Sequence, residues 1–175
     1  WLYYPAVLDP DELAFTGTER TQLNASLAAY QAGHLTDALH AYPGYPEPAS
    51  LGSDATLSYL AALYLSVGAV DRAESILRST SISNRPAGIA LRLMIHAVTN
   101  GVEPLRSFDP DGSLTRSQSA SVQLALSYAH QATNNLSSAL AAARRSVERA
   151  PSFGFAWARV AELEFSFGNT RAAGE

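Results

Sequence analysis

Apolar residues recur at helical spacing along most of the chain, in segments that single glycine or asparagine residues separate. These separating residues are spaced by 35, 33, 33 and 34 positions: Gly33, Gly68, Gly101, Asn134 and Gly168. Each follows one apolar-periodic segment and precedes another, and Gly or Asn favours the left-handed conformation that ends a helix. The pattern predicts a unit of helix, tight turn and helix that repeats about every 34 residues.

Other positions keep the same register. Apolar residues lie eight positions before each turn: Ala25, Leu60, Leu93, Leu126 and Val160. With one exception, alanines lie five positions after it: Ala38, Ala73, Arg106, Ala139 and Ala173. Small side chains let two antiparallel helices approach closely. Because no alternating run of strand length is present, we expect an all-α fold without a β-sheet.

These residues resemble the tetratricopeptide repeat (TPR) family over roughly residues 19–175. The helix A consensus of that family is matched best in the fifth and second units, by Trp157-x-x-Val160-Ala161 and by Leu57-x-x-Leu60-Ala61-x-x-Tyr64. The resemblance implies a right-handed superhelical solenoid of about five antiparallel hairpins, the last of them truncated. It also implies a concave groove that binds a protein or peptide segment.

The segment 1–18 lies outside the period, as a linker followed by a short helix. Its first eight residues are apolar and aromatic, and they must dock on something. Asp9 is a helix-capping residue followed by Pro10, which predicts a short helix to about Phe15. This stretch faintly resembles the segment that joins a FecR-like regulatory domain to TPR units in some bacterial envelope-associated proteins.

Two units depart from the pattern. In the first, the second helix should run only from Leu35 to about Tyr42, because several prolines follow it. In the third, Pro104 follows the turn closely, so we expect a helical stub there, or no TPR hairpin at all. The sequence Asp109-Pro110-Asp111-Gly112 lacks the spacing of a calcium loop and predicts a β-turn with a helix cap behind it.

Composition and charge narrow the possible functions. The net charge is −4 and all basic residues are Arg, with no basic run to follow a nucleic acid backbone. Cysteine is absent, and the four histidines have neither the spacing nor the carboxylate partners of a metal site. We therefore expect no enzyme activity, no cofactor, no bound metal and no insertion into a membrane. The compartment, bacterial periplasm or cytoplasm, stays open.

The groove is the remaining candidate for function. The usual groove positions of the TPR family select eight residues for contact with a partner: Leu27, Tyr30, Gln31, Leu65, Tyr128, Gln131, Glu162 and Phe165. This lining is mostly apolar or uncharged and lacks the Lys-containing clamp with which chaperone-binding TPR proteins hold a terminal carboxylate. The alternative is a structural spacer or oligomerisation module of a larger, FecR-like regulatory protein.

The C-terminal end of the array is a second candidate for contact. The helix from about Phe155 to Phe167 carries large apolar residues, yet only a few residues follow its turn. We expect this end to be covered by further chain or by a second copy in a homo-oligomer. Coverage by the aromatic N-terminal segment would show that this expectation is wrong.

Overall fold

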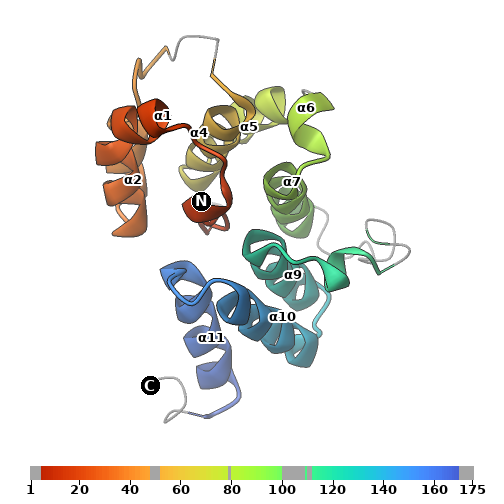
Figure 1. Ribbon diagram of the computed structural model, residues 1–175. Coiled ribbons are helices and arrows are strands. Elements are labelled where there is room, and N and C mark those ends of the chain that lie inside the picture. The colour runs from red at the N-terminus through yellow and green to blue at the C-terminus, as the bar shows by residue number, and fades with distance from the viewer. Residues whose placement is uncertain (1–4, 48–51, 79, 100–108, 110–111, 170–175) are drawn as a thin grey trace.

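The computed structural model describes residues 5–47, 52–78, 80–99, 109 and 112–169, and every regular element among them is a helix (Figure 1). The all-α prediction is therefore confirmed for these residues. The first half contains η1 (Pro10–Glu12), α1 (Gly17–Gln22), α2 (Asn24–Gln31), α3 (Leu35–His40), α4 (Asp54–Ser66), α5 (Val70–Leu77), α6 (Thr80–Ser83) and α7 (Pro86–Thr99). The second half contains η2 (Leu114–Arg116), α9 (Ala120–Ala132), α10 (Leu136–Arg149) and α11 (Gly154–Ser166).

Four of the five predicted turn residues close a helix in the left-handed conformation. Their φ angles are 80°, 82°, 58° and 78° at Gly33, Gly68, Asn134 and Gly168. At Gly68, its amide donates to the carbonyl of Leu65 at 2.9 Å, and the next amide donates to the carbonyl of Tyr64 at 2.8 Å. The other three turns make the same pair of bonds, which is the Schellman arrangement. The prediction is confirmed at these positions, and Gly101 lies outside the described residues.

Small residues sit where the two helices of a hairpin meet. Ala38, Ala73 and Ala139, each five positions after a turn, are fully buried. They lie at the contacts of α2 with α3, α4 with α5 and α9 with α10, while α7 joins the two halves by packing against α4 and α9. The second helix of the first hairpin, α3, ends at His40, as the following prolines predict.

The described residues cover only part of the irregular third unit. Residues 100–108 lie outside the described part of the chain, so the expected stub is not placed. Beyond them, the Gly112 amide donates to the Asp109 carbonyl at 3.3 Å, and the Asp109 carboxylate accepts from the Leu114 amide at 3.1 Å, the first residue of η2. These two bonds agree with the predicted turn and helix cap, while Pro110 and Asp111 lie outside the described residues.

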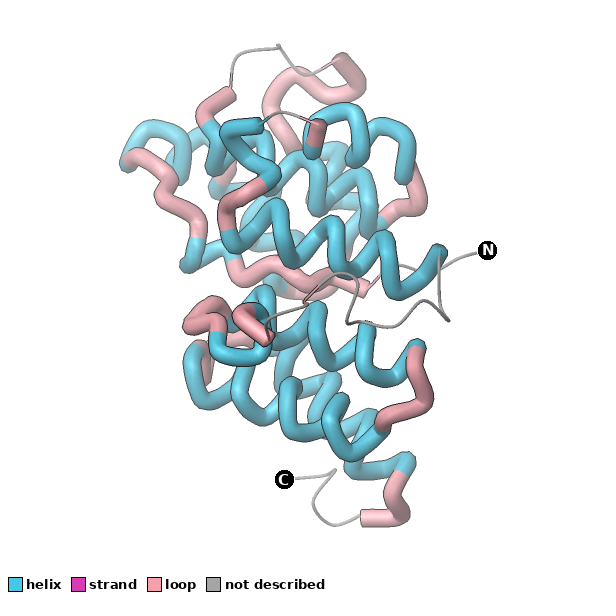
Figure 2. The backbone as a smooth tube through the Cα atoms, turned by 90° about the vertical axis from the view of Figure 1, so that its right-hand side faces the viewer, coloured by secondary structure: helices cyan, strands magenta, loops and turns pink. Residues whose placement is uncertain are grey.

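The N-terminal segment lies inside the array. Figure 1 shows it within the arc that the helices form, and Figure 2 shows it passing between the half that contains α1–α7 and the half that contains α9–α11. Ala6, Val7 and Leu8 are 5%, 1% and 0% exposed. The expected helix to Phe15 is a single 3-10 turn that ends at Glu12, because Leu13 is already extended.

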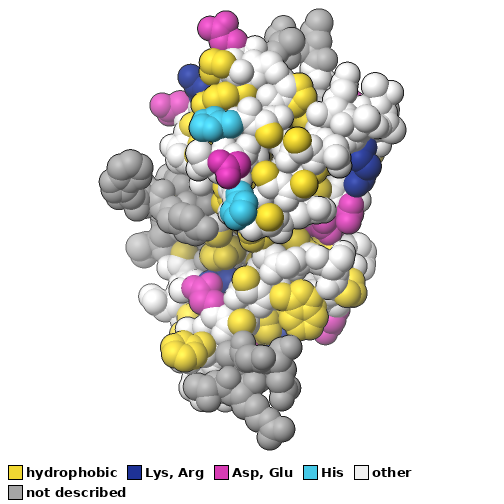
Figure 3. Space-filling view, turned by 90° about the vertical axis from the view of Figure 1, so that its left-hand side faces the viewer, with side chains coloured by type: hydrophobic (Ala, Val, Ile, Leu, Met, Phe, Trp, Pro, Cys, Tyr) yellow, Lys and Arg dark blue, Asp and Glu magenta, His cyan; other side chains and the backbone are white. Residues whose placement is uncertain are grey.

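Helix α11 begins and ends within one residue of its predicted bounds and leaves large apolar side chains in solvent. Trp157, Phe165 and Phe167 are 49%, 68% and 42% exposed, whereas Leu163 is buried against α10. Figure 3 shows hydrophobic side chains at the surface of the lower part of the molecule, where α10 and α11 lie. Among the described residues, this is the largest collection of exposed aromatic side chains.

Candidate protein-binding surface

The eight residues predicted to contact a partner fall into two groups. Leu27, Tyr30 and Leu65, from α2 and α4, are buried. The other five have solvent access, with Tyr128 half-buried and the rest exposed: Gln31, Tyr128, Gln131, Glu162 and Phe165. The structure thus separates an N-terminal set inside the protein from a mostly C-terminal set at its surface.

Tyr30 is buried because other parts of the chain cover it. Its hydroxyl donates to the carbonyl of Leu8 in the N-terminal segment at 3.0 Å. Its ring meets those of Tyr59 and Phe155 edge-on, with centroid distances of 5.5 and 5.3 Å. Burial raises the pKa of the Tyr30 hydroxyl. Tyr30 has no surface on which a partner could contact it, because the N-terminal segment and Phe155 lie against it. Leu27 and Leu65 are buried as well.

Three of the surface residues come together around one cavity. Tyr128 and Gln131 from α9 and Glu162 from α11 line a space of about 320 Å³. Its remaining wall is apolar and is formed by Pro5, Met94, Ala97, Val98 and Ala132. The cavity is large enough for a side chain of a partner, and it combines an apolar wall with a polar rim, as binding sites commonly do.

A buried arginine holds the polar rim in place. Arg159 of α11 has a fully buried side chain, and its Nη1 donates to Glu162 Oε2 at 2.7 Å. Its Nε donates to Ser127 Oγ at 3.0 Å, and its Nη2 donates to the side-chain oxygen of Gln131. The guanidinium also stacks on the ring of Tyr128, with its carbon 4.0 Å from the ring centroid. One cation thus positions all three polar residues of the cavity.

Sequence reasoning did not select Arg159. It lies between positions assigned to helix packing, and a lone Arg in an amphipathic helix is usually solvated. The one available signal is its spacing of three residues from Glu162, which places both side chains on the same helix face.

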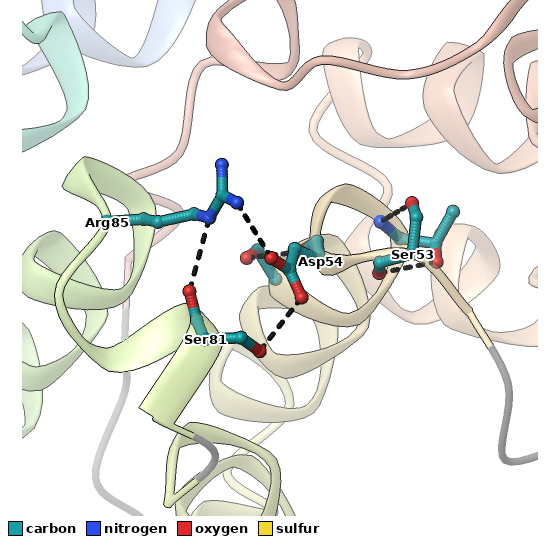
Figure 4. Close-up of polar contacts among 6 residues, drawn as sticks. Ser53, Asp54, Ser81 and Arg85 are labelled. Atoms are coloured by element: carbon teal, nitrogen blue, oxygen red, sulfur yellow. Dashed lines mark hydrogen bonds and ion pairs between the residues drawn. The ribbon is translucent and has the colours of Figure 1, made fainter.

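A larger cavity of about 600 Å³ lies where the N-termini of α4, α7 and α9 meet. At its edge Asp54, the first residue of α4, accepts from Arg85 Nη2 at 2.9 Å and from the Ser81 hydroxyl at 2.9 Å. The Arg85 Nε donates to the Ser81 carbonyl at 3.1 Å (Figure 4). These bonds tie α4 to α6 and α7 and pair the charges of Asp54 and Arg85 with each other.

The carboxylate of Glu12, in the N-terminal segment, binds the N-terminus of α9. The Glu12 carboxylate accepts from the Ser119 hydroxyl at 2.7 Å, from the Ser121 amide at 3.1 Å and from the Ala120 amide. A carboxylate is stabilised there by free amide groups and by the helix dipole. Hydrogen bonds to a charged carboxylate thus hold the N-terminal segment on α9, in addition to the burial of its side chains.

Comparison of the chain with protein-family models, with curated proteins and with solved structures finds no match. Within the described residues, no group of three or more His, Cys, Asp or Glu side chains is placed to hold a metal ion. None of the described helices is both long enough and apolar enough to cross a membrane.

We expect the stability of the folded chain to depend on pH through Asp9 in the N-terminal segment. Burial raises the pKa of its carboxyl, the charges of Asp11 and Glu12 raise it further, and a hydrogen bond from the Asp11 amide opposes them. A raised folded-state pKa means that Asp9 favours folding most below its unfolded pKa of about 3.9, and that this contribution is lost as the pH rises through the folded value.

We therefore expect Asp9→Asn, which keeps a capping side chain without the charge, to gain stability relative to the native chain as the pH rises from about 4 to 7. Urea unfolding of both proteins at several pH values measures this difference. A difference that does not change with pH would show that Asp9 has the same pKa in the folded and unfolded chains.

Proposed function

We propose that the chain is a non-catalytic scaffold of TPR-like hairpins that binds a protein or peptide segment. The observation that carries this proposal is the cavity of about 320 Å³ between α7, α9 and α11, at which Tyr128, Gln131 and Glu162 meet. The repeated Schellman turns and the buried alanines between paired helices support the TPR-like arrangement.

The chemistry of the cavity indicates what it would take. Its wall suits an aliphatic or aromatic side chain of the partner. At its rim, the Glu162 side chain is 57% exposed and its carboxylate can accept a bond from a neighbouring Arg or Lys of that partner. We expect the bound segment to place a large apolar residue beside a basic one.

Filling the cavity should remove this binding. Ala97 is half-buried and lines the wall, so Ala97→Leu should occupy the space that a partner's side chain needs. Peptides selected from a displayed random library on the native chain are expected to lose about 1–3 kcal/mol of binding free energy on Ala97→Leu. Fluorescence anisotropy with the purified chains measures the affinity.

The matched control is Ala141→Leu, the same change at an exposed position of α10. It should leave the affinity unchanged. Selected peptides that bind Ala97→Leu as well as they bind the native chain would place their site elsewhere and count against the cavity.

The exposed aromatic side chains of α11 favour a second candidate, association of this end with a second copy or with further helices. Trp157, Phe165 and Phe167 are all more than 40% exposed. Burying such apolar surface is favourable by about 25 cal/mol per Å². Light scattering over a range of concentrations, with Trp157→Gln and Phe165→Gln as variants, distinguishes this role from a monomeric scaffold.

A further inference from the structure

We propose that the inner surface of the array is a binding site for an extended peptide in which aliphatic residues precede acidic ones, and that the chain's own segment Pro5–Glu12 occupies it as an exchangeable ligand. We call this surface the inner site and define it by Tyr30, Ser121, Phe155 and the first turn of α9. The proposal goes beyond the cavity at Tyr128, Gln131 and Glu162, because it assigns a second site that binds a peptide of different chemistry.

The inner site binds the extended part of the segment, which precedes the 3-10 turn η1, through its main chain. The Tyr30 hydroxyl donates to the Leu8 carbonyl at 3.0 Å, and the Ser121 hydroxyl accepts from the Asp9 amide at 2.9 Å. These two contacts come from α2 and α9, on opposite sides of the segment. Both bind backbone groups, so they would hold any extended peptide in the same register.

Side chains of the segment supply selectivity. Val7 and Leu8 are almost completely buried, which requires apolar residues at these positions. Four residues after Leu8, the Glu12 carboxylate binds Ser119, Ala120 and Ser121 at the N-terminus of α9. The matching partner is therefore a segment with two or three aliphatic residues and a carboxylate about one helical turn further on.

The segment does not fill the space around it. Three cavities have it as part of their walls: about 600 Å³ beside Glu12 and Leu13, about 310 Å³ beside Asp9 and Pro10, and about 320 Å³ beside Pro5. All three pockets open to solvent. A partner with larger side chains could therefore make contacts in them that the segment does not make.

The segment is also separate from the helical hairpins. It lies outside the 34-residue period and joins α1 through residues 13–16, of which Leu13 is extended. The first turn of α1 has its own capping box between Thr16 and Glu19, so the helix does not depend on the segment for its start. The segment can therefore leave the inner site without unwinding α1.

The test uses a fluorescent peptide with the sequence of residues 5–16 and the full chain. A site that its own segment occupies binds an added peptide weakly, because only the open fraction is available. In the chain, Glu12→Gln weakens the binding of the segment to the inner site. The affinity of this chain for the native peptide should therefore rise about tenfold. In the peptide, the same change should weaken binding to either chain, so one substitution has opposite effects in the two places.

Asp11→Asn in the chain is the control, because Asp11 contacts Arg20 at the surface and has no contact with α9 among the described bonds. It should leave peptide affinity unchanged. Equal affinity of the native peptide for the native and Glu12→Gln chains, or no binding to a folded Glu12→Gln chain, overturns the proposal. If Glu12→Gln unfolds the chain, rescue of its helical circular dichroism by the native peptide supports the proposal, and failure to rescue overturns it.

Failure of the inner site can be distinguished from failure of the proposed protein-binding function. If the peptide of residues 5–16 does not exchange while library peptides still depend on Ala97, the segment is a fixed part of the fold and the cavity remains the binding site. If neither the peptide of residues 5–16 nor the library peptides bind, the protein-binding function fails together with the inner site.

Discussion

Tyr30→Ala is expected to destabilise the folded chain by about 3–5 kcal/mol, the cost of truncating a fully buried aromatic residue. The Tyr30 ring is wholly buried and touches Tyr59 of the second hairpin and Phe155 of α11. Its loss opens a cavity between the two halves and leaves the Leu8 carbonyl without its donor. Urea unfolding followed by circular dichroism measures the change in the free energy of unfolding.

Tyr30→Phe separates the ring from the hydroxyl. It keeps the ring contacts and removes only the bond to Leu8, so it should cost about 1–2 kcal/mol. From the sequence, Tyr30 is expected to contact a partner at the surface. A Tyr30→Ala chain as stable as the native one would restore that interpretation and show that the N-terminal segment does not cover Tyr30 in solution.

Gly88→Ala is expected to destabilise the chain by about 1–3 kcal/mol, because a side-chain carbon has no room there. A Cβ at Gly88 would lie 2.2 Å from the Ile82 carbonyl oxygen and 2.9 Å from its carbon. These are backbone atoms of α6, so relief requires that α6 and α7 move apart. The midpoint of urea unfolding should fall, with the slope of the transition unchanged.

Gly154→Ala is the matched control. Gly154 is the first residue of α11, and nothing lies within 4 Å of an added Cβ. Alanine there reduces the entropy of the unfolded chain without strain, so it should be neutral or stabilise by up to about 1 kcal/mol. If Gly88→Ala were as neutral or stabilising as Gly154→Ala, the higher helix propensity of alanine would outweigh the close approach of α6 to Gly88.

Much of the local structure could be predicted from the sequence because it depends on neighbouring residues. The left-handed turns need Gly or Asn at one position, and Gly33, Gly68, Asn134 and Gly168 all provide it. The bounds of α11 follow from its apolar periodicity. In contrast, the N-terminal helix was predicted too long, since the capping signal at Asp9 marks where a helix begins and carries little information on where it ends.

The candidate surface could be predicted only in part. The usual groove positions of the TPR family, placed on the 34-residue register, selected Tyr128, Gln131 and Glu162, which line one cavity. The register cannot indicate what covers those positions. Tyr30 is covered by a segment outside the period, through contacts between residues far apart in the chain that leave no local pattern.

The contact between Tyr30 and Phe155 has a consequence for how the chain folds. In an open helical array each unit touches only its neighbours, so the ends can fray and folding can start anywhere. Here α2 meets α11, and Asp9 bonds to Ser121, 112 positions along the chain. Such contacts raise the average sequence separation of contacting residues, which slows folding relative to a purely local helical protein. The two ends should consequently melt together, as one cooperative unit, rather than unravel one hairpin at a time.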